Sequence, residues 1–507
     1  MNAGLVQHDR NMKAHFPRSL FLRGALGIAS AAVGFAGISR ITASGAVPGA
    51  GSAGNASGSG SGGGADPEWS ELRVKLRGRA LLPGNWDYPM AKQVFNTRFD
   101  DDRPAAVVQV ADAGDVATAL RFAAEHDLEV AARAGGHSYA GLSTAAGTLI
   151  IDVRRLRGVR VEGERAVIGP GHTLHEVYRE LDRSGRSLPS GSCPGVGLAG
   201  LTLGGGLGVE SRAYGLTCDR LTAATLVLPD GTVTEVSASS RPDLFWALRG
   251  GGSLFGIVTS LTFDTIPATP KDVVRLAFPG EQADRVIAGW QEWLRGAERD
   301  RWANVSVDAD GAGGLTCWMQ LVCPAGTGEA VTADLVEAIG VAPAETDART
   351  LGHLDTVMYL AGGTVDPPRC AFTNGSDIVA ALTPDVIDRV LAALTRFSSV
   401  GGTGWVQVNT LDGAVRDLSP TATAFPWRAH AAMVEWGAYE PIPHDAAVEF
   451  IADAHAAMGS DSVGAYVNYL EPGDPLSRYY GGNHTRLAEL RARVDPGNRI
   501  RTVLRSS

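Results

Sequence analysis

Two short glycine-rich segments set the strongest limit on how this chain can fold. One is Arg133-Ala134-Gly135-Gly136-His137-Ser138-Tyr139, and the other is Ser190-Gly191-Ser192-Cys193-Pro194-Gly195-Val196. Each places one nucleophilic side chain, His137 or Cys193, among glycines in a weakly charged stretch. Glycine lets backbone N–H groups approach a bulky group closely. A fold that brings the two segments together would therefore let both side chains reach one ring system.

The composition is that of a large globular protein. The chain has 507 residues, of which 44% are hydrophobic and 20% charged, so it can bury an extensive core and divide into two domains. Its formal net charge is −10, so the chain as a whole is acidic. Because phosphate backbones require a basic surface, the sequence excludes a nucleic-acid partner.

The cysteines indicate neither a metal site nor a disulfide scaffold. No CxxC pair offers zinc ligands, and the spacing of the five cysteines is irregular. Cys317 and Cys323 are interpreted as small buried hydrophobic residues. If Cys193 binds a cofactor, between zero and two disulfides are possible among Cys218, Cys317, Cys323 and Cys370.

The first 66 residues are expected to lie outside the folded part. In residues 1–45, Arg18 and Arg23 flank the short segment 19–22. The apolar run from Gly24 to Ile38 that follows is too short for a membrane span. This stretch resembles a twin-arginine export signal, with Ser19 in place of the second arginine, and predicts an exported protein that is not inserted in the membrane. Residues 46–66 form a Gly/Ser-rich tether.

From residue 104 to 267 strands and helices alternate. Residues 106–110 are predicted as a strand, 115–126 as an amphipathic helix capped by Asp112 or Asp115, and 129–132 as a strand that leads into the His137 segment. Further strands are expected at 148–153, 159–162 and 166–168, a helix at 173–183, a hairpin at 221–228 and 232–236, and a short helix at 243–249. The pattern predicts an α+β domain.

Residues 271–460 indicate a second domain, in which a sheet is backed by helices. Strands are expected at 315–321 and 405–408, and helices at 284–295 and 383–397. Residues 461–507 are expected to return to the first domain.

A literal GxGxxG stands at Gly195-Val196-Gly197-Leu198-Ala199-Gly200. A Rossmann site requires a strand before this motif and a helix after it, whereas here Ser-Gly-Ser-Cys-Pro precedes it and Gly204, Gly205 and Gly206 follow. The better interpretation is a glycine-lined loop whose backbone amides hold a pyrophosphate without help from Lys or Arg.

Four positions outside the glycine loops are candidates for substrate contact. Trp405 and Gln407 share a face of one strand, where an indole and an amide suit a sugar. Glu435 lies inside an apolar strand, where a carboxylate needs a partner or a raised pKa. Gln320 is a weaker candidate. Each could instead be a core or surface residue.

Tyr466-Val467-Asn468-Tyr469 alternates as a strand would, with Asn468 and Tyr469 on opposite faces. A tyrosine has a pKa of about 10, so Tyr469 would need nearby positive charge or hydrogen bonds to act as a base near neutral pH. The alternative is a half-buried structural tyrosine.

These segments, together with Asp243-Leu244-Phe245-Trp246-Ala247-Leu248-Arg249-Gly250-Gly251-Gly252 and the C-terminal stretch from Tyr466 to Asn498, resemble flavin-linked oxidases of the berberine-bridge-enzyme and oligosaccharide-oxidase type. The resemblance covers residues 104–501 and implies a two-domain fold with a vanillyl-alcohol-oxidase-type FAD-binding domain at 67–270 and a substrate domain at 271–460. It implies FAD attached covalently through His137 and Cys193. The further cofactor contacts that it implies are Arg133, Gly135, Gly136, Ser138, Tyr139, Gly195, Val196, Gly197, Gly200, Gly204, Gly205, Gly206, Gly256, Ile257, Tyr469 and Asn498.

The same resemblance implies the chemistry. Tyr469, assisted by Glu435, would deprotonate a substrate hydroxyl while hydride passes to the flavin, and O2 would be reduced to H2O2. Val196 is a small residue at a position where the family leaves room for O2, and Tyr139 would also touch the substrate. The favoured substrate is a sugar oxidised at its anomeric carbon, followed by a glycosylated or polycyclic secondary metabolite.

Two departures from the family pattern stand out. Ser253-Leu254 occupies the place of the usual Gly-Asn, and Trp427 occupies the place of the usual His. They leave room for a carbohydrate-binding protein that retains flavin without catalysis. Within the enzyme class, the rival function is a dehydrogenase that passes electrons to another acceptor.

Overall fold

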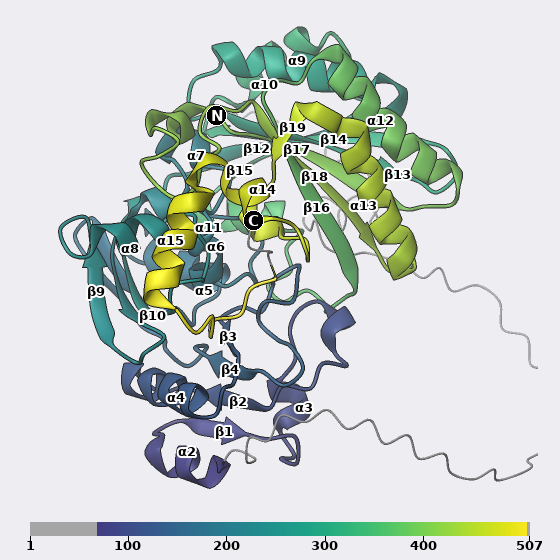
Figure 1. Ribbon diagram of the computed structural model, residues 1–507. Coiled ribbons are helices and arrows are strands. Elements are labelled where there is room, and N and C mark those ends of the chain that lie inside the picture. The colour runs from purple at the N-terminus through teal and green to yellow at the C-terminus, as the bar shows by residue number, and fades with distance from the viewer. Residues whose placement is uncertain (1–67, 504–507) are drawn as a thin grey trace, which may run out of the picture.

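The computed structural model describes residues 68–503 (Figure 1). The predicted export signal at 1–45 and the tether at 46–66 lie outside the described residues. Within residues 68–503, no helix combines the length and the apolar character that crossing a membrane requires.

The first part of the chain forms two small sheets. In the four-stranded sheet, β2, β4 and β3 run parallel because α4 crosses over between β2 and β3, and β1 pairs antiparallel with β2. Asp112 caps α4 by accepting a hydrogen bond from the Asp115 N–H, as predicted. The elements are α2 (Trp69–Lys75), β1 (Arg79–Leu81), β2 (Ala106–Gln109), α4 (Ala113–Glu125), β3 (Val130–Arg133) and β4 (Leu149–Asp152).

The second small sheet has five antiparallel strands in the order β5-β6-β10-β8-β9. The predicted hairpin is present as β8 and β9. Thr173 and Glu176 form a capping box that begins α5. The elements are β5 (Val159–Glu162), β6 (Arg165–Ile168), α5 (Leu174–Asp182), β8 (Leu221–Val227), β9 (Val233–Ser237), α8 (Pro242–Ala247) and β10 (Ile257–Asp264), with the short α6 (Leu198–Leu203) and α7 (Ser211–Tyr214) before β8.

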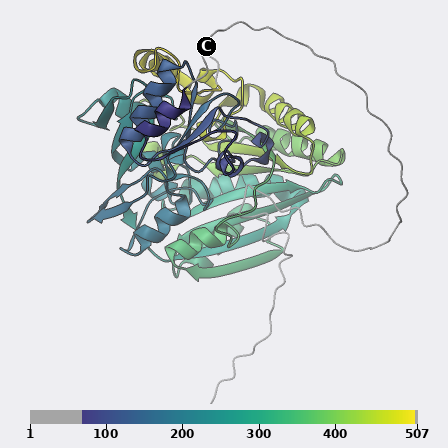
Figure 2. The same ribbon diagram turned by 90° about the horizontal axis from the view of Figure 1, so that it is seen from below.

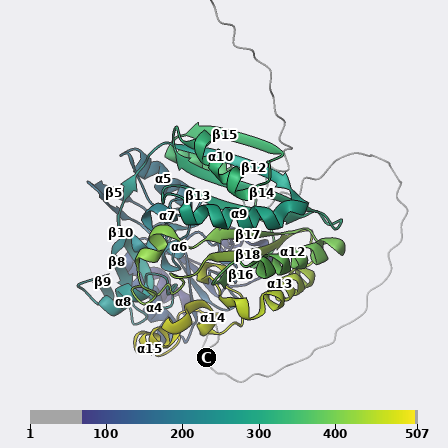
Figure 3. The ribbon, with the colours of Figure 1, turned by 90° about the horizontal axis from the view of Figure 1, so that it is seen from above.

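An eight-stranded antiparallel sheet forms the larger part of the remainder, in the order β15-β12-β14-β13-β17-β18-β16-β19. Helices α9, α10, α12 and α13 cover its outer face (Figures 1 and 3), and Trp290, Trp436 and Phe450 belong to the core between them. The strands are β12 (Lys271–Pro279), β13 (Trp302–Ala309), β14 (Leu315–Pro324), β15 (Glu345–Leu351), β16 (Phe372–Val379), β17 (Gly404–Thr410), β18 (Ala432–Tyr439) and β19 (Ser462–Gly464), and the helices are α9 (Ala283–Gly296), α10 (Gly328–Ile339), α11 (His353–Leu360), α12 (Pro384–Ser399) and α13 (His444–Met458).

The C-terminal segment returns to the first sheet, as expected. The Val130 N–H donates to the Arg499 carbonyl and the Arg501 N–H to the Val130 carbonyl, each at 2.8 Å. Figure 2 shows the yellow C-terminal elements beside the purple and blue N-terminal ones. The helices here are α14 (Leu476–Tyr480) and α15 (His484–Val494).

The prediction of a strand at 466–469 is wrong. Val467–Tyr469 is a 3-10 turn, η6, closed by a hydrogen bond from the Tyr469 N–H to the Tyr466 carbonyl at 2.8 Å. Tertiary contacts override the alternating pattern, because the Asn468 side chain donates to the Leu201 carbonyl and to the Tyr466 hydroxyl.

The predicted α+β class with an antiparallel sheet backed by helices is confirmed. All five cysteines are free, and Cys317 and Cys323 lie in the hydrophobic core as expected. The inner face of the eight-stranded sheet is the one that meets the glycine-rich loops.

Candidate active site

The loops that carry His137 and Cys193 meet at two glycines. A Cβ added to Gly135 would lie 2.3 Å from the Gly197 nitrogen, and one added to Gly197 would lie 2.3 Å from the Gly135 nitrogen. A Cβ on Gly195 would lie 3.3 Å from His137 Nε2. Backbone therefore packs directly on backbone at this crossing, and only glycine fits at Gly135 and Gly197.

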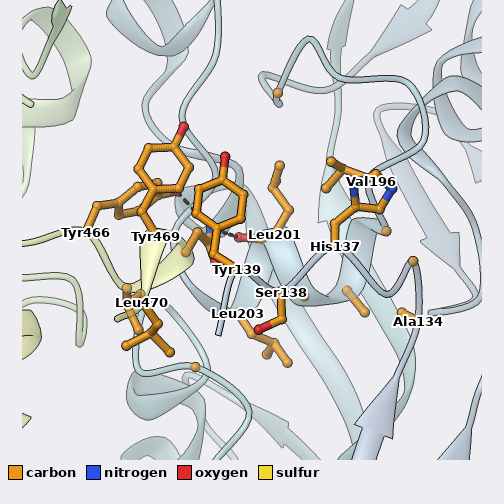
Figure 4. A pocket seen from close by; sticks show the side chains of 18 of the residues that line it. Ala134, His137, Ser138, Tyr139, Val196, Leu201, Leu203, Tyr466, Tyr469 and Leu470 are labelled. Carbon is orange, nitrogen blue, oxygen red and sulfur yellow. Dashed lines mark hydrogen bonds between the residues drawn. The ribbon is translucent and has the colours of Figure 1, made fainter. Parts of the chain in front are cut away.

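One cavity lies beside this crossing, and it is bounded by two walls. The loop wall contains Arg133, Ala134, Gly135, Gly136, His137, Ser138, Tyr139, Gly191, Ser192, Cys193, Val196, Gly197, Gly200, Gly208, Gly252, Gly256 and Ile257. The sheet wall contains Trp302, Asn304, Gln320, Gln407, Asn409 and Glu435, and η6 contributes Tyr469 at the junction. Figure 4 shows His137 and Val196 on one side of this cavity and Tyr139, Tyr466 and Tyr469 on the other.

His137 is held as a neutral ring with one nitrogen unused. Its imidazole stacks on Phe95, with ring centroids 4.3 Å apart. Burial lowers the pKa of His137 to about 4, so the ring is uncharged at neutral pH. Its buried Nδ1 has no hydrogen-bond partner among residues 68–503. A neutral imidazole with an unpartnered nitrogen is a competent nucleophile.

Cys193, unlike His137, is in the less reactive of its two protonation states. Burial, with the nearby Glu435 carboxylate as a second cause, raises the pKa of the Cys193 thiol to about 12. The side chain also acts electrostatically on Tyr139 and Tyr469. Cys193 therefore lies close enough to the tyrosines and Glu435 to sense their charge, and at neutral pH it remains a thiol rather than the more reactive thiolate.

Glu435 is the central acid of the sheet wall. Its side chain is 3% exposed and accepts hydrogen bonds from the Tyr139 hydroxyl at 3.1 Å and from Asn374 Nδ2 at 3.3 Å, and Tyr469 also bonds to it. Burial raises the pKa of Glu435 to about 7. The carboxyl group is thus poised to exchange a proton near neutral pH.

Tyr469 and Tyr139 share that carboxyl group. Their rings stack with centroids 5.0 Å apart and 7° between planes. Burial, and then the negative charge of Glu435, raises the pKa of each hydroxyl well above its ordinary value. The condition under which Tyr469 could act as a base, a pKa lowered by positive charge or hydrogen bonds, is not met by the described residues, because burial and the negative charge of Glu435 both raise that pKa.

Four amides extend the sheet wall away from Glu435. Gln320 and Gln407 line the cavity, as predicted, and Gln407 Nε2 donates to Asn409 Oδ1 at 3.1 Å. Asn304, Asn409 and the neighbouring Trp302 were not predicted from the sequence. The signal was available, since Trp302-Ala303-Asn304 repeats the spacing of Trp405-Val406-Gln407.

Trp405 does not line the cavity. Its indole lies over Gly437 on the neighbouring strand, where a Cβ would come within 2.4 Å of the ring. It also stacks near Tyr439, with centroids 6.2 Å apart. The missing side chain at Gly437 leaves space for this ring over the neighbouring strand, away from the lining in which a substrate contact was predicted.

Of the predicted cofactor contacts, Arg133 lines the cavity without turning its guanidinium to it, whereas Asn498, Gly195, Gly204, Gly205 and Gly206 do not line it. The Arg133 guanidinium turns back to Asp152, at 2.7 Å, and both side chains are 1% exposed. Asn498 lies in the turn after α15, with its N–H bonded to the Asp495 carbonyl. Gly195 packs on His137, and the run Gly204, Gly205 and Gly206 packs against Asn468, Tyr466 and Thr217 instead of lining the cavity.

The GxGxxG motif opens a helix after all. Gly197 is the N-cap of α6, contrary to the sequence interpretation. The rejection of a Rossmann site still holds, because the preceding strand, β7, is the two-residue Arg186–Ser187, far from the motif.

The lining is almost free of charge. Among the described lining residues, Arg133 and Glu435 are the only ones of the types Arg, Lys, Asp and Glu, and the Arg133 guanidinium pairs with Asp152, which also pairs with Arg154. This lining leaves backbone N–H groups as the donors that a bound anionic group could use, so the predicted role of the glycine-lined loop stays a prediction.

The comparisons with known proteins agree with this arrangement. A family model described as an FAD binding domain matches residues 104–237, and one described as berberine and berberine like matches residues 465–502. Over 434 residues the chain is 30% identical to the xylooligosaccharide oxidase of Thermothelomyces thermophilus, an alignment that covers 78% of this chain and 85% of that protein. This chain belongs to the berberine-bridge-like family of FAD-linked oxidoreductases.

Two further relatives extend the likeness over nearly the whole described chain. An uncharacterized FAD-linked oxidoreductase of Bacillus subtilis is 29% identical over 442 residues, covering 85% of this chain and 96% of that one. The solved structure of a chitooligosaccharide oxidase has a TM-score of 0.78 at 25% identity and covers 86% of this chain and 99% of that one. The predicted family, fold and enzyme class are confirmed.

The residues present fit FAD. The Gly135–Gly197 crossing leaves room beside it for a bulky ring, the unpartnered His137 Nδ1 offers an attachment point, and the uncharged loop wall offers backbone N–H groups to a pyrophosphate. His137 and Cys193 reach this one cavity from two loops.

Proposed function

We propose that this enzyme is an oxidase with doubly attached FAD that oxidises a CH–OH group of a sugar. The observation that carries the proposal is the buried Glu435, held by Tyr139 and facing the same cavity as His137 and Cys193. When bound, the flavin accepts a hydride from the substrate carbon and returns the electrons to O2, giving H2O2.

His137 and Cys193 are the attachment points in this proposal. Nδ1 of His137 is the nucleophilic atom, because no residue of the described chain bonds to it. The Cys193 sulfur would have to lose its proton before it could bond to the flavin ring, and the negative charge of Glu435 opposes that loss. We therefore expect the histidyl bond to form more readily than the cysteinyl bond. Each such addition would leave two electrons on the flavin, and O2 would remove them.

Glu435 is the general base in the proposed reaction, ahead of Tyr469. At neutral pH a substantial share of Glu435 is carboxylate, whereas the Tyr469 hydroxyl keeps its proton. Glu435 accepts the proton of the substrate hydroxyl, and Tyr139 and Tyr469 orient the carboxylate through their hydrogen bonds. Removing this proton makes it easier for the neighbouring carbon to give up hydride.

The amides of the sheet wall support a sugar as substrate. Neutral amides donate and accept hydrogen bonds to hydroxyl groups without attracting a counter-ion. The relatives named as xylooligosaccharide and chitooligosaccharide oxidases are consistent with this choice. Val196, a small side chain in the loop wall, supports O2 as the electron acceptor, since it would leave space beside a bound flavin.

Two measurements test the proposal. The pellet of acid-precipitated holoenzyme should stay yellow, and mass spectrometry should find flavin on the peptides that contain His137 and Cys193. Reducing sugars should bleach the flavin without air and produce one H2O2 per sugar in air. A colourless pellet refutes the covalent attachment, whereas bleaching without peroxide formation in air refutes the oxidase reaction in favour of a dehydrogenase.

A further inference from the structure

Phe95 covers one face of the His137 imidazole. The two rings stack with centroids 4.3 Å apart and 17° between planes, and Phe95 is 8% exposed. Phe95 does not line the cavity, whereas His137 does, so Phe95 acts on a bound cofactor only through His137. A stacked ring that is itself held in place restricts rotation of the imidazole beside it. Phe95 therefore sets the plane in which the two nitrogens of His137 lie.

The backbone at Phe95 is anchored to both walls of the cavity. The Phe95 N–H donates to the Gly136 carbonyl at 2.9 Å, which ties Phe95 to the loop that carries His137. The next residue, Asn96, is 1% exposed, and its Nδ2 donates to the Phe372 carbonyl at the start of β16, at 3.0 Å. Hydrogen bonds to the glycine loop and to the large sheet thus give Phe95 a fixed place against His137.

Gly195, from the loop that carries Cys193, holds the opposite edge of the imidazole. A Cβ added to Gly195 would lie 3.3 Å from His137 Nε2. Burial lowers the pKa of His137, and a hydrogen bond to the Gly195 backbone opposes this shift. A hydrogen bond that favours the protonated ring runs from a ring N–H to a carbonyl. Because Nδ1 has no partner among residues 68–503, Nε2 is the donor, and the lone pair is left on Nδ1.

We propose that Phe95 and the Gly195 carbonyl are the positioning groups for covalent attachment at His137: Phe95 fixes the plane of the imidazole, and Gly195 fixes the tautomer in which Nδ1 is the nucleophile. This inference rests on the proposed function, in which His137 is an attachment point. Nδ1 bonds to a methyl carbon of the flavin, and one C–H bond of that methyl breaks. The two electrons of the C–H bond pass through the flavin ring to O2, which becomes H2O2 with the methyl proton and one imidazole proton.

The test measures how fast the bond at His137 forms. Full-length protein from a riboflavin-starved host receives FAD, and mass spectrometry of acid-quenched samples follows flavin on the His137 and Cys193 peptides over time. In Phe95→Leu, which removes the flat ring, attachment at His137 should slow by about two- to tenfold. Phe95→Tyr, which keeps a flat ring, should restore the wild-type rate. The amount of FAD bound before quenching should be the same in all three proteins.

Phe372→Leu is the matched control. Phe372 belongs to the same aromatic cluster and is 2% exposed, but its ring contacts are with Phe95, Tyr139 and Tyr439 rather than with His137. Its attachment rate should equal that of the wild type. An unchanged rate in Phe95→Leu, an equal loss in Phe372→Leu, or a parallel fall in bound FAD would make Phe95 an ordinary core residue and overturn its role. Phe95→Met takes the place of Phe95→Leu if thermal unfolding shows that Phe95→Leu does not fold.

Gly195 is tested in a Cys193→Ser background, where His137 is the remaining attachment point. Cys193→Ser keeps the Gly195 carbonyl, so FAD should still become attached at His137. Adding Gly195→Ala presses a Cβ against Nε2 and should slow this attachment by about two- to tenfold. An unchanged rate would overturn the role of Gly195. A wild-type protein that binds FAD but forms no bond at His137 would refute the proposed attachment itself, which sets that failure apart from a failure of the positioning groups.

Discussion

The two walls of the cavity are built on opposite principles. The loop wall consists of backbone and small side chains, and at Gly135 and Gly197 it tolerates no added atom. The sheet wall presents long polar side chains, among them Gln320, Gln407 and Glu435, from strands whose backbone is already fully paired. The loop wall suits a cofactor that stays bound, and the sheet wall suits substrates that bind and dissociate.

The largest effect should follow from crowding the loop wall. In Gly197→Ala the new Cβ would lie 2.3 Å from the Gly135 nitrogen, and neither backbone can yield without separating the two loops. We expect loss of at least nine-tenths of the bound flavin, measured by absorbance of the purified protein, together with loss of activity.

Gly84→Ala is the control for this variant, because a Cβ there meets nothing within 4 Å and Gly84 lies outside the cavity lining. Gly200→Ala sharpens the comparison. Its Cβ also meets no protein atom within 4 Å, yet Gly200 lines the cavity, so flavin loss in this variant would report contact with the cofactor itself. Full flavin occupancy in Gly197→Ala would show that the crossing is not required.

The next largest effect concerns the base on the sheet wall. Glu435→Gln keeps the size and the hydrogen bonds but cannot accept a proton, so the rate of flavin reduction should fall by about 10²–10⁴-fold. In the wild type this rate should rise with pH through about 7, as the carboxyl group ionises. The variant should lose that rise, as measured by stopped-flow reduction without air across pH 5 to 9.

Tyr139→Phe tests whether Glu435 is the base and the Tyr139 hydroxyl only adjusts its pKa. The Tyr139 hydroxyl helps hold the pKa of Glu435 down, so its removal should move the rise to higher pH without abolishing it. If instead Glu435→Gln retains the rise and a tyrosine variant abolishes it, Tyr469 is the base and Glu435 only its neighbour.

The loop wall could be predicted from the sequence, whereas much of the sheet wall could not. A His or Cys among glycines is a local pattern, and the glycines that meet at the crossing belong to those same patterns. By contrast, Trp302 and Trp405 have equivalent local sequences. The choice between them depends on Gly437 of a neighbouring strand, which only the register reveals. The pKa of Tyr469 similarly depends on Glu435, which is distant in sequence.

A smaller effect of Glu435 should appear in stability. Because the pKa of Glu435 is raised in the fold, the protonated form favours folding, and this contribution is complete below the ordinary pKa and is lost as pH rises through about 7. Relative to Glu435→Gln, the wild type should therefore lose up to about 3 kcal/mol of unfolding free energy between pH 4 and 8. Denaturant unfolding of both proteins at several pH values measures the difference, and parallel curves would contradict the raised pKa.

The smallest expected effect concerns the contact between η6 and α6, where the two walls of the cavity meet. Asn468 in η6 donates to the Leu201 carbonyl at the end of α6, at 3.0 Å, and to the Tyr466 hydroxyl at 2.9 Å. Asn468→Ala leaves that carbonyl unsatisfied and should cost about 1–2 kcal/mol of unfolding free energy. Gly204→Ala should also destabilise, because its Cβ would lie 2.0 Å from Asn468 Oδ1.

The double variant tests whether this contact holds η6 against α6. Asn468→Ala removes the amide oxygen with which the new Cβ of Gly204→Ala would collide, so the two substitutions combined should be more stable than the sum of the single effects allows. Thermal unfolding of the four proteins completes the cycle. Effects that add within about 0.5 kcal/mol would mean that α6 and η6 are positioned independently. A positive coupling would instead mean that the run from Gly204 to Gly206 is required for docking η6, and with it Tyr469, against the loop wall.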